Sequence, residues 1–227
     1  MNKSYVLLSL LFLLSCHQTE KSYEGIELVK IDVDRKACMD MSEFIEKIEI
    51  VPFQTDTNCL VGEYNKFIYC KELSMYIYKD RRGIVSLFSD DGKFISNSES
   101  VIGPGPGEYQ IVVDVAYNPF SQAIELLGPY GTIYRYDLSF NFIEKISLNQ
   151  NKIVFDLFHP LSAEQYVLIP LGKSIMYYCD FSKKEILLPP LNYNDDGIHM
   201  MTMNYNSFFY IEDELFFSPQ GATFHYI

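Results

Sequence analysis

Asp114 and Asp156 are the residues whose type and spacing best suit chemistry at a shared site. Each stands near the start of a short apolar run, Val113–Tyr117 or Phe155–Phe158, and the two lie 42 residues apart. Two carboxylates brought together from neighbouring repeats could hold Ca²⁺ through oxygen ligands. Alternatively, each aspartate accepts hydrogen bonds from backbone N–H groups where its strand begins, as aspartates do in turns. The sequence favours this structural role for both.

Arg81 and Arg82 are the other charged motif. They follow Asp80 and could clamp an anionic sugar or a peptide carboxylate, although a solvated turn is the commoner reason for adjacent arginines. Tyrosines at strand spacing, such as Tyr76 and Tyr78, could stack on sugar rings. Packing between sheets is the commoner role at that spacing and is favoured here.

The stretch Gly103–Tyr109 must be a loop. Three glycines alternate with two prolines, so neither a helix nor a central strand can pass through it. It lacks the Lys-Ser/Thr pair and the helix that a phosphate-binding loop requires. We therefore predict that it connects one sheet to the next.

The cysteines and histidines show no clear functional motif. No Cys or His spacing resembles a zinc site, and the four histidines share no motif. If Cys16 is a lipid attachment point, Cys38, Cys59, Cys70 and Cys179 remain. Cys59 and Cys70 could close a short loop, but four cysteines allow three connectivities.

A repeat organises the chain from about residue 64. The unit is a strand, a polar turn and a second strand, and its equivalent positions are Phe88, Tyr136, Cys179 and Tyr226, at spacings of 48, 43 and 47 residues. A period in the forties with short strands predicts an all-β protein, a β-propeller of four-stranded antiparallel blades, here about four of them. A β-sandwich ranks second, because its strands would alternate more cleanly between apolar and polar residues.

The composition supports strands and excludes some partners. The chain has 18 Tyr, 17 Phe and no Trp, which favours strands over helices. Its 30 acidic and 18 basic residues give a net charge of −12, which argues against nucleic acid and against anionic lipid as partners.

Glu49–Phe53 is expected to be a strand, with Pro52 suited to an edge, and Ile111–Tyr117 a buried strand. Asp91-Gly92 is expected to form a two-residue hairpin turn with positive φ.

Residues 1–15 predict a lipoprotein signal peptide. Lys3 precedes an apolar run, Tyr5–Leu14, that is too short to span a bilayer as a helix. The run ends in Leu-Leu-Ser-Cys, which looks like a bacterial lipobox with Cys16 as the lipidated residue. An ordinary secretory signal is the alternative. Residues 16–40 are then a tether with a first strand at 26–31, and 41–227 hold the blades.

Several motifs carry a family resemblance. Ile50–Asp56, Val61-Gly62, Ser89–Ile95 and Gly105–Tyr109 resemble the six-bladed β-propeller lipoproteins of Gram-negative bacteria, which are similar to NHL-repeat proteins. The resemblance covers about residues 26–227 and implies a fold and an envelope location, with the outer membrane favoured. An arginine that often precedes the glycine loop in that family is absent, since Ser98–Val101 occupies the region.

A six-bladed ring is larger than this chain. At this period it needs roughly 270 residues, so we expect an incomplete ring, with a closed four-bladed ring as the alternative. In a propeller, one rim collects the loops before each innermost strand and the turns between second and third strands. The predicted ligand-binding rim comprises Arg81, Arg82, Glu108, Tyr109, Asp114, Tyr130, Asp156 and Lys173.

The predicted function is that of a lipid-anchored binding or scaffold module in the cell envelope. Its rim would face a glycan, a peptide or a protein. The alternative is an enzyme of the lactonase or lyase kind, as some similar propellers are, with a metal at the channel mouth. An enzyme needs a metal or an acid–base set at one point, and only Asp114 and Asp156 occupy matched positions. No catalytic residue is therefore predicted, and binding is preferred.

Overall fold

The computed structural model describes residues 45–57, 59–148, 152–173, 175–187, 191–192, 208–211, 214–217 and 225–226. The predicted signal peptide, Cys16, the tether with its strand at 26–31, and Cys38 lie outside these residues. The chain divides into two units, 1–48 and 49–227, and the second holds every strand discussed below. Among the described residues, no helix is both long enough and apolar enough to cross a membrane.

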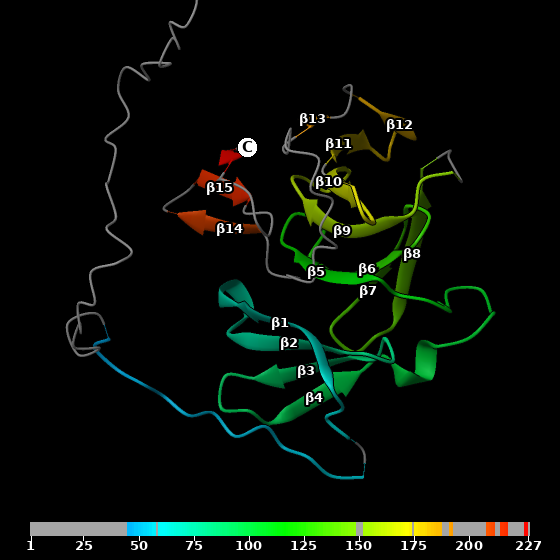
Figure 1. Cartoon of the computed structure of the whole chain (residues 1–227). Helices are drawn as coiled ribbons and strands as arrows, with labels where there is room; N and C mark the ends of the chain where they lie inside the picture. The colour runs from blue at the N-terminus through cyan, green and yellow to red at the C-terminus, as the bar shows by residue number, and fades with distance from the viewer. Residues whose placement is uncertain are drawn as a thin grey trace, which may run out of the picture. The chain divides into compact units, whose positions relative to one another are not determined.

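Three antiparallel sheets follow one another along the chain as blades (Figure 1). Blade 1 comprises β1 (Tyr64–Cys70), β2 (Met75–Asp80), β3 (Val85–Ser89) and β4 (Phe94–Asn97). Blade 2 comprises β5 (Asp114–Asn118), β6 (Ala123–Gly128), β7 (Thr132–Tyr136) and β8 (Phe142–Ser147). Blade 3 comprises β9 (Phe155–Pro160), β10 (Gln165–Pro170), β11 (Ile175–Asp180) and β12 (Glu185–Ile186), with β13 (Leu191–Asn192) also paired to β11.

A further sheet has three strands, β14 (Phe208–Ile211), β15 (Glu214–Phe217) and β16 (His225–Tyr226). Helical structure in the described part is limited to the 3₁₀ turns η3 (Lys71–Leu73) and η4 (Glu99–Val101). The predicted fold is therefore confirmed, a β-propeller of four-stranded antiparallel blades.

The register confirms the predicted repeat. In each sheet the residue predicted to be equivalent lies on the third strand and pairs across to the second. The pairs are Phe88 with Tyr76, Tyr136 with Ile124, Cys179 with Tyr166, and Tyr226 with Phe216. Repetition in the sequence thus corresponds to repetition in strand pairing.

Apolar clusters fill the spaces between blades. Ile77 and Leu87 of blade 1 pack with Val115 and Leu126 of blade 2, and all four are fully buried. A second cluster joins blades 2 and 3 in the same way. Full burial of one such side chain stabilises the fold by about 1.5–3 kcal/mol. Because the middle blade packs on both sides, its strands are apolar on both faces, as the sequence indicated.

Two predicted strands differ in the structure. Glu49–Phe53 forms no strand, and Ile50 is 87% exposed. Its apolar residues suggested a strand with Pro52 at an edge, but the segment packs instead through Phe53, whose ring stacks on Phe88 at 4.5 Å. The buried strand predicted from Ile111 begins only at Asp114.

The turn between β3 and β4 agrees with its prediction. Gly92 has φ +82°, a conformation that other residues adopt only with strain. A Cβ atom at this position would also lie 2.2 Å from the Pro52 carbonyl oxygen. Glycine is therefore required here both by the turn and by the segment that packs against it.

The cysteines form no disulfide within the described residues. Cys59, Cys70 and Cys179 are buried free thiols. Cys59 packs with Tyr78 and Phe88, whereas Cys70 lies in the core between blades 1 and 2. The suggested Cys59–Cys70 loop is therefore not closed, because the two residues belong to different clusters.

Candidate functional site

The strand pairing is irregular at the start of β1 and of β9, and in each case the extra residue is polar. Asn65 has no partner on β2, since Tyr64 pairs with Asp80 and Lys66 with Lys79. Asp156 is likewise the extra residue of β9 opposite β10. Such bulges re-aim a side chain and are common beside functional sites. In blade 2, Asp114 occupies the corresponding position in a regular ladder.

Asp114 ties three inner strands together. Its side chain is fully buried, and its Oδ1 accepts from Lys66 Nζ at 2.7 Å and from Val115 N at 2.9 Å. Its Oδ2 accepts from Phe158 N of β9 at 3.0 Å. Burial raises the pKa of this carboxyl, and Lys66 opposes the shift. Backbone N–H groups are the partners that the sequence favoured; the buried lysine was missed.

Lys79 is the second buried cation of this group. It lies on β2, is 4% exposed, and donates from Nζ to Asn65 Oδ1. Burial lowers its pKa, and Asp114 opposes that effect. We call Asn65, Lys66, Lys79, Asp114 and Asp156 the inner-strand cluster.

Asp156 differs from its neighbours in the cluster. It is only partly buried, and no hydrogen-bond partner for its carboxylate lies among the described residues. Burial, together with the nearby charge of Asp114, raises its pKa to about 6, against the pull of Lys79 and Lys66. On the same strand, burial and then Lys66 lower the pKa of His159 to about 4, and its ring stacks on Phe208 at 4.9 Å.

The alternative reading of Asp114 and Asp156, a Ca²⁺ site, does not fit this geometry. Both oxygens of Asp114 already accept hydrogen bonds, one of them from a lysine that a cation would have to displace. Among the described residues, no three His, Cys, Asp or Glu side chains gather as metal ligands do. We therefore derive no chemistry through a metal here.

The remaining predicted rim residues have different surroundings. Arg81 Nη1 lies 3.2 Å from Glu63 and Arg82 Nε lies 2.8 Å from Asp80, both arginines being largely exposed. Tyr130 and Lys173 lie on exposed turns. Glu108 is partly buried, and its Oε2 accepts from Gly105 N.

Tyr109 requires a correction. It was expected on the rim, but it is 1% exposed and lies in the core between blades 1 and 2. Its hydroxyl donates to Gly83 O at 2.9 Å and shares a hydrogen bond with Ser98 Oγ. The glycine loop turns back on itself, since Tyr109 N donates to Val101 O, and this places the ring inside.

Val154 and Leu171 add apolar side chains to the rim that the sequence did not indicate, next to Tyr130, which was predicted there. Phe155 N donates to Pro129 O at 2.8 Å, and Leu171 N donates to Val154 O at 2.9 Å, so the turns of blades 2 and 3 meet around β9. The side chains next to these bonds are exposed: Tyr130 by 54%, Leu171 by 44% and Val154 by 37%. We call Tyr130, Val154 and Leu171 the rim patch. Their turns were predicted, but nothing in the sequence shows that they meet.

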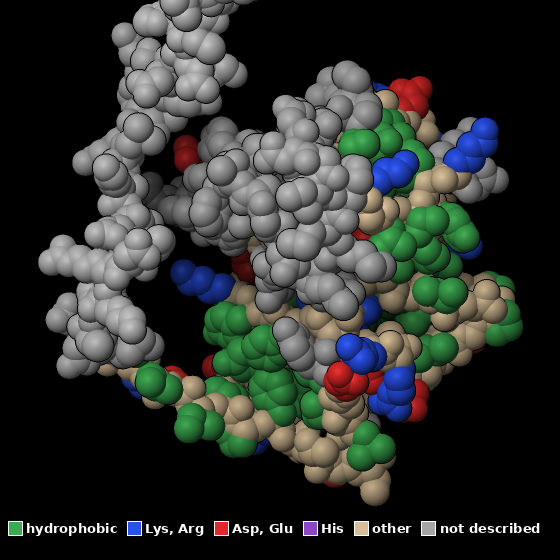
Figure 2. Space-filling view, in the orientation of Figure 1, with side chains coloured by type: hydrophobic (Ala, Val, Ile, Leu, Met, Phe, Trp, Pro, Cys, Tyr) green, Lys and Arg blue, Asp and Glu red, His purple; other side chains and the backbone are tan. Residues whose placement is uncertain are grey.

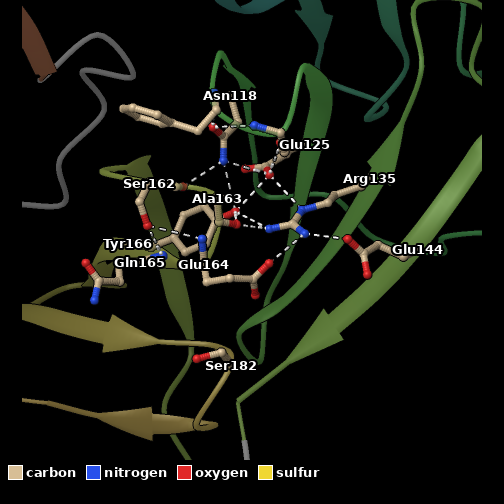
Figure 3. Close-up of polar contacts among 12 residues, drawn as sticks. Asn118, Glu125, Arg135, Glu144, Ser162, Ala163, Glu164, Gln165, Tyr166 and Ser182 are labelled. Carbon is tan, nitrogen blue, oxygen red and sulfur yellow. Dashed lines mark hydrogen bonds and ion pairs between the residues drawn. The ribbon is translucent and has the colours of Figure 1, made fainter.

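A second buried network joins blades 2 and 3 (Figure 3). Arg135 Nε donates to Glu125 Oε1 at 2.9 Å, and its Nη1 lies within ion-pair distance of Glu144 and Glu164. Asn118 and Tyr166 also donate to Glu125 Oε1. We call this group the seam network. Its charges lie between sheets, not on the rim.

Exposed charges of both signs lie close together elsewhere on the surface. On the face drawn in Figure 2, Lys and Arg side chains lie beside acidic ones over part of the described surface, with green hydrophobic side chains nearby. The surface of this acidic chain is therefore mixed in charge and in polarity on that face.

Several solved structures are similar to this chain. A protein from Bacteroides fragilis that is described as exported has a TM-score of 0.53 and 14% identity, covering 76% of this chain and 49% of that one. A protein of unknown function from Bacteroides caccae gives a TM-score of 0.45 and 10% identity, covering 72% and 57%. The Cps50 (Swd1) β-propeller domain of Myceliophteria thermophila gives 0.42 and 8%, covering 71% and 64%. The chain thus spans less than two thirds of each.

Relatives among curated proteins give no further guidance, because none matches the chain. A family model does match, over residues 26–222. The chain therefore belongs to the family described as a domain of unknown function, DUF4934.

Proposed function

We propose that this protein is a non-enzymatic binding or scaffold module whose rim holds a glycan, a peptide or a protein. The observation that carries the proposal is the rim patch: Tyr130, Val154 and Leu171 are exposed on turns that meet around β9, beside Asp156. Exposed apolar side chains that gather next to polar groups mark interaction sites more often than scattered ones do.

The inner-strand cluster supports this proposal because it links the inner strands that carry the rim loops. Asp114 links β1, β5 and β9 through one ion pair and two backbone hydrogen bonds. A buried link of this kind fixes the inner strands, and the loops that precede them, relative to one another. Binding sites built on such rigid elements lose less conformational entropy when a ligand docks.

A binding measurement with matched variants tests the proposal. The rim variant carries Tyr130→Ser and Leu171→Ser; the control carries Phe120→Ser, an equally exposed ring between β5 and β6, at the other end of the strands. Both should fold, because each of these side chains is 44–59% exposed. On arrays of oligosaccharides and peptides, a ligand of the native protein should be lost by the rim variant and kept by the control.

Hydrogen exchange in the presence of that ligand locates the footprint independently. Protection should appear in the turns at 129–131 and 171–173. Protection confined to the opposite turns, at 90–93 and 139–141, would show that the proposal is wrong.

The charged rim residues belong to the proposal as a frame for the ligand. Arg81, Arg82 and Lys173 are exposed at the same end of the strands as the rim patch. Glu108 stays a candidate through its partly buried carboxylate. We propose no contact with nucleic acid, since the net charge of −12 opposes it.

We also propose that the protein is anchored in the cell envelope, at the outer membrane, through lipid on Cys16. The support is the apolar run that ends in Leu-Leu-Ser-Cys. The Cys16→Ser variant should fail to incorporate labelled fatty acid and should leave the detergent phase. Continued labelling of this variant would contradict the anchor without touching the rim.

A further inference from the structure

We infer that the rim site recognises a basic side chain, the guanidinium or ammonium group of a peptide, with Asp156 as its counter-ion. The inference rests on the proposed function and names the chemistry of the ligand. It follows from three observations: the charge state of the cluster, the surroundings of Asp156, and the residues that flank it.

Asp156 has no direct hydrogen-bond or ion-pair partner among the described residues, although Lys79 and Lys66 lie near enough to lower its pKa. Lys66 neutralises Asp114 at 2.7 Å, and Lys79 is directed to Asn65. Of the exposed arginines, Arg81 faces Glu63 and Arg82 faces Asp80. Within the described part of the rim, Asp156 is thus a carboxylate without an ion-pair partner. A cationic group on a ligand would give Asp156 the kind of partner that the other acids of the site already have.

The position of Asp156 suits a charged ligand group. Its side chain is partly buried, so a salt bridge formed there is shielded from water more than a surface pair is. It is also partly exposed, so a ligand can reach it. No hydrogen bond or ion pair among the described residues uses the Asp156 carboxylate, so its oxygens are available to the donors of a ligand.

The rim patch suits the stem of a basic side chain. Val154 lies two residues before Asp156, and the backbone bonds of Phe155 and Val154 bring the Tyr130 and Leu171 turns beside it. Aliphatic stems of Arg and Lys pack on apolar surfaces while their charged ends stay paired. An aromatic ring such as Tyr130 adds cation–π attraction. The net charge of −12 also favours the approach of a cationic partner.

Lys173 allows a test of whether the ligand is cationic or anionic. It is exposed two residues after Leu171, so it repels a cationic ligand and attracts an anionic one. Lys173→Ala should therefore strengthen binding of a basic peptide at low salt, about twofold or more, and should weaken binding of an acidic one.

The experiment uses labelled hexapeptides in one sequence context, with Arg, Lys, citrulline or Glu at the centre, in fluorescence anisotropy titrations. Arg and Lys peptides should bind, and the isosteric but neutral citrulline should bind at least about tenfold more weakly. Asp156→Asn should lower the affinity for the Arg peptide by a similar factor. The control Asp90→Asn, which removes an exposed acid at the opposite end, should not.

The pH dependence of peptide affinity provides a second test on the native protein. The charged groups that face Asp156 are Asp114 on β5, Lys66 on β1 and Lys79 on β2. Because the carboxyl has a pKa of about 6, affinity for the Arg peptide should fall as the pH is lowered from 7 to 5. The fall should be absent in Asp156→Asn.

The outcomes separate this inference from the proposed function. Binding of the Arg peptide that is indifferent to Asp156→Asn overturns the inference. Binding of a neutral oligosaccharide or of the Glu peptide, abolished by Tyr130→Ser with Leu171→Ser, overturns it while the rim stays the binding site. If the rim variant changes the binding of no probe on peptide or oligosaccharide arrays, the inference and the proposed function fail together.

Discussion

The inner-strand cluster and the seam network are two groups of charged residues that differ in how completely their charges are paired. In the seam network, Arg135 faces Glu125, Glu144 and Glu164, and Glu125 Oε1 accepts several donors. In the inner-strand cluster, Asp114 is equally well paired, but Asp156 is not. Both groups join blades and both include partly exposed acids, but Glu144 and Glu164 each face Arg135, whereas Asp156 has no such partner among the described residues.

This difference separates structural charge from charge available to a ligand. A buried charge without a partner is costly, so proteins pair nearly all of them. Glu125 Oε2 has no partner in the described structure, but its carboxylate still faces Arg135 directly. Asp156 lacks even that. Predictions that remove one member of each group test whether the two are distinct.

The largest effect is expected from Arg135→Met. This change leaves Glu125 buried without its cation, and breaking a buried pair on one side costs about 3–5 kcal/mol of unfolding free energy. The measurement is urea denaturation followed by fluorescence or circular dichroism. Lys145→Met is the control, because Lys145 is exposed on β8 and lies 5.6 Å from the Tyr134 ring centroid; it should change stability by less than about 1 kcal/mol.

Lys66→Met should have a somewhat smaller effect, about 3 kcal/mol. Asp114 loses its cation but keeps the backbone N–H groups of Val115 and Phe158. Adding Asp114→Asn to Lys66→Met should recover part of the loss, because the amide carries no charge. If Lys66→Met alone left the free energy of unfolding unchanged, the ion pair would contribute nothing to stability. Asp114 would then not resemble the paired acids of the seam network.

Gly92→Val supplies an uncharged reference. The positive φ of Gly92 and the nearby Pro52 carbonyl both oppose a side chain, and strain of this kind costs roughly 1–3 kcal/mol. The loss should be the same at pH 5 and pH 8, unlike the effects of changing charges. An unchanged denaturation midpoint would contradict the strained turn.

How much of this could be predicted from the sequence depends on the range of each interaction. Repeats and turns are local, so the blades and the Asp91-Gly92 turn followed from residue order. The role of Asp114 as a backbone acceptor was also visible, because aspartate at a strand start has few alternatives. Lys66 and Lys79 were not foreseen, since a lysine among strand residues gives no sign of the carboxylate that buries it.

Long-range contacts also account for the errors. Tyr109 was expected on the rim because its loop is there, yet its ring is held inside by Ser98 and Gly83. The Glu49–Phe53 segment has strand-forming apolar residues but is not a strand in the described structure. Tyr130 was predicted on the rim, but Val154 and Leu171 were missed for the same reason, because their place beside it depends on how turns from two blades meet.

The smallest effect, and the most discriminating, is expected from Asp156→Asn. The pKa of Asp156 is raised in the folded state from 3.8 to about 6, so the unfolded chain loses this proton first as the pH rises. Stability therefore decreases between about pH 4 and pH 6, and the full penalty remains at pH 7. Asparagine removes it. After allowance for partial exposure, the variant should be more stable at pH 7 by roughly 1–2 kcal/mol.

The gain should shrink as the pH falls from 6 to 4 and should disappear below about pH 3, where the carboxyl of Asp156 is protonated in both the folded and the unfolded state. Asp90→Asn should show no such trend. A stabilising substitution at this acid, together with loss of the basic peptide, is the pattern of a residue kept for binding at the expense of stability. If Asp156→Asn instead destabilises the protein at pH 7, as the loss of a paired acid would, then Asp156 is a structural charge like Asp114. The two buried groups would then differ in location alone.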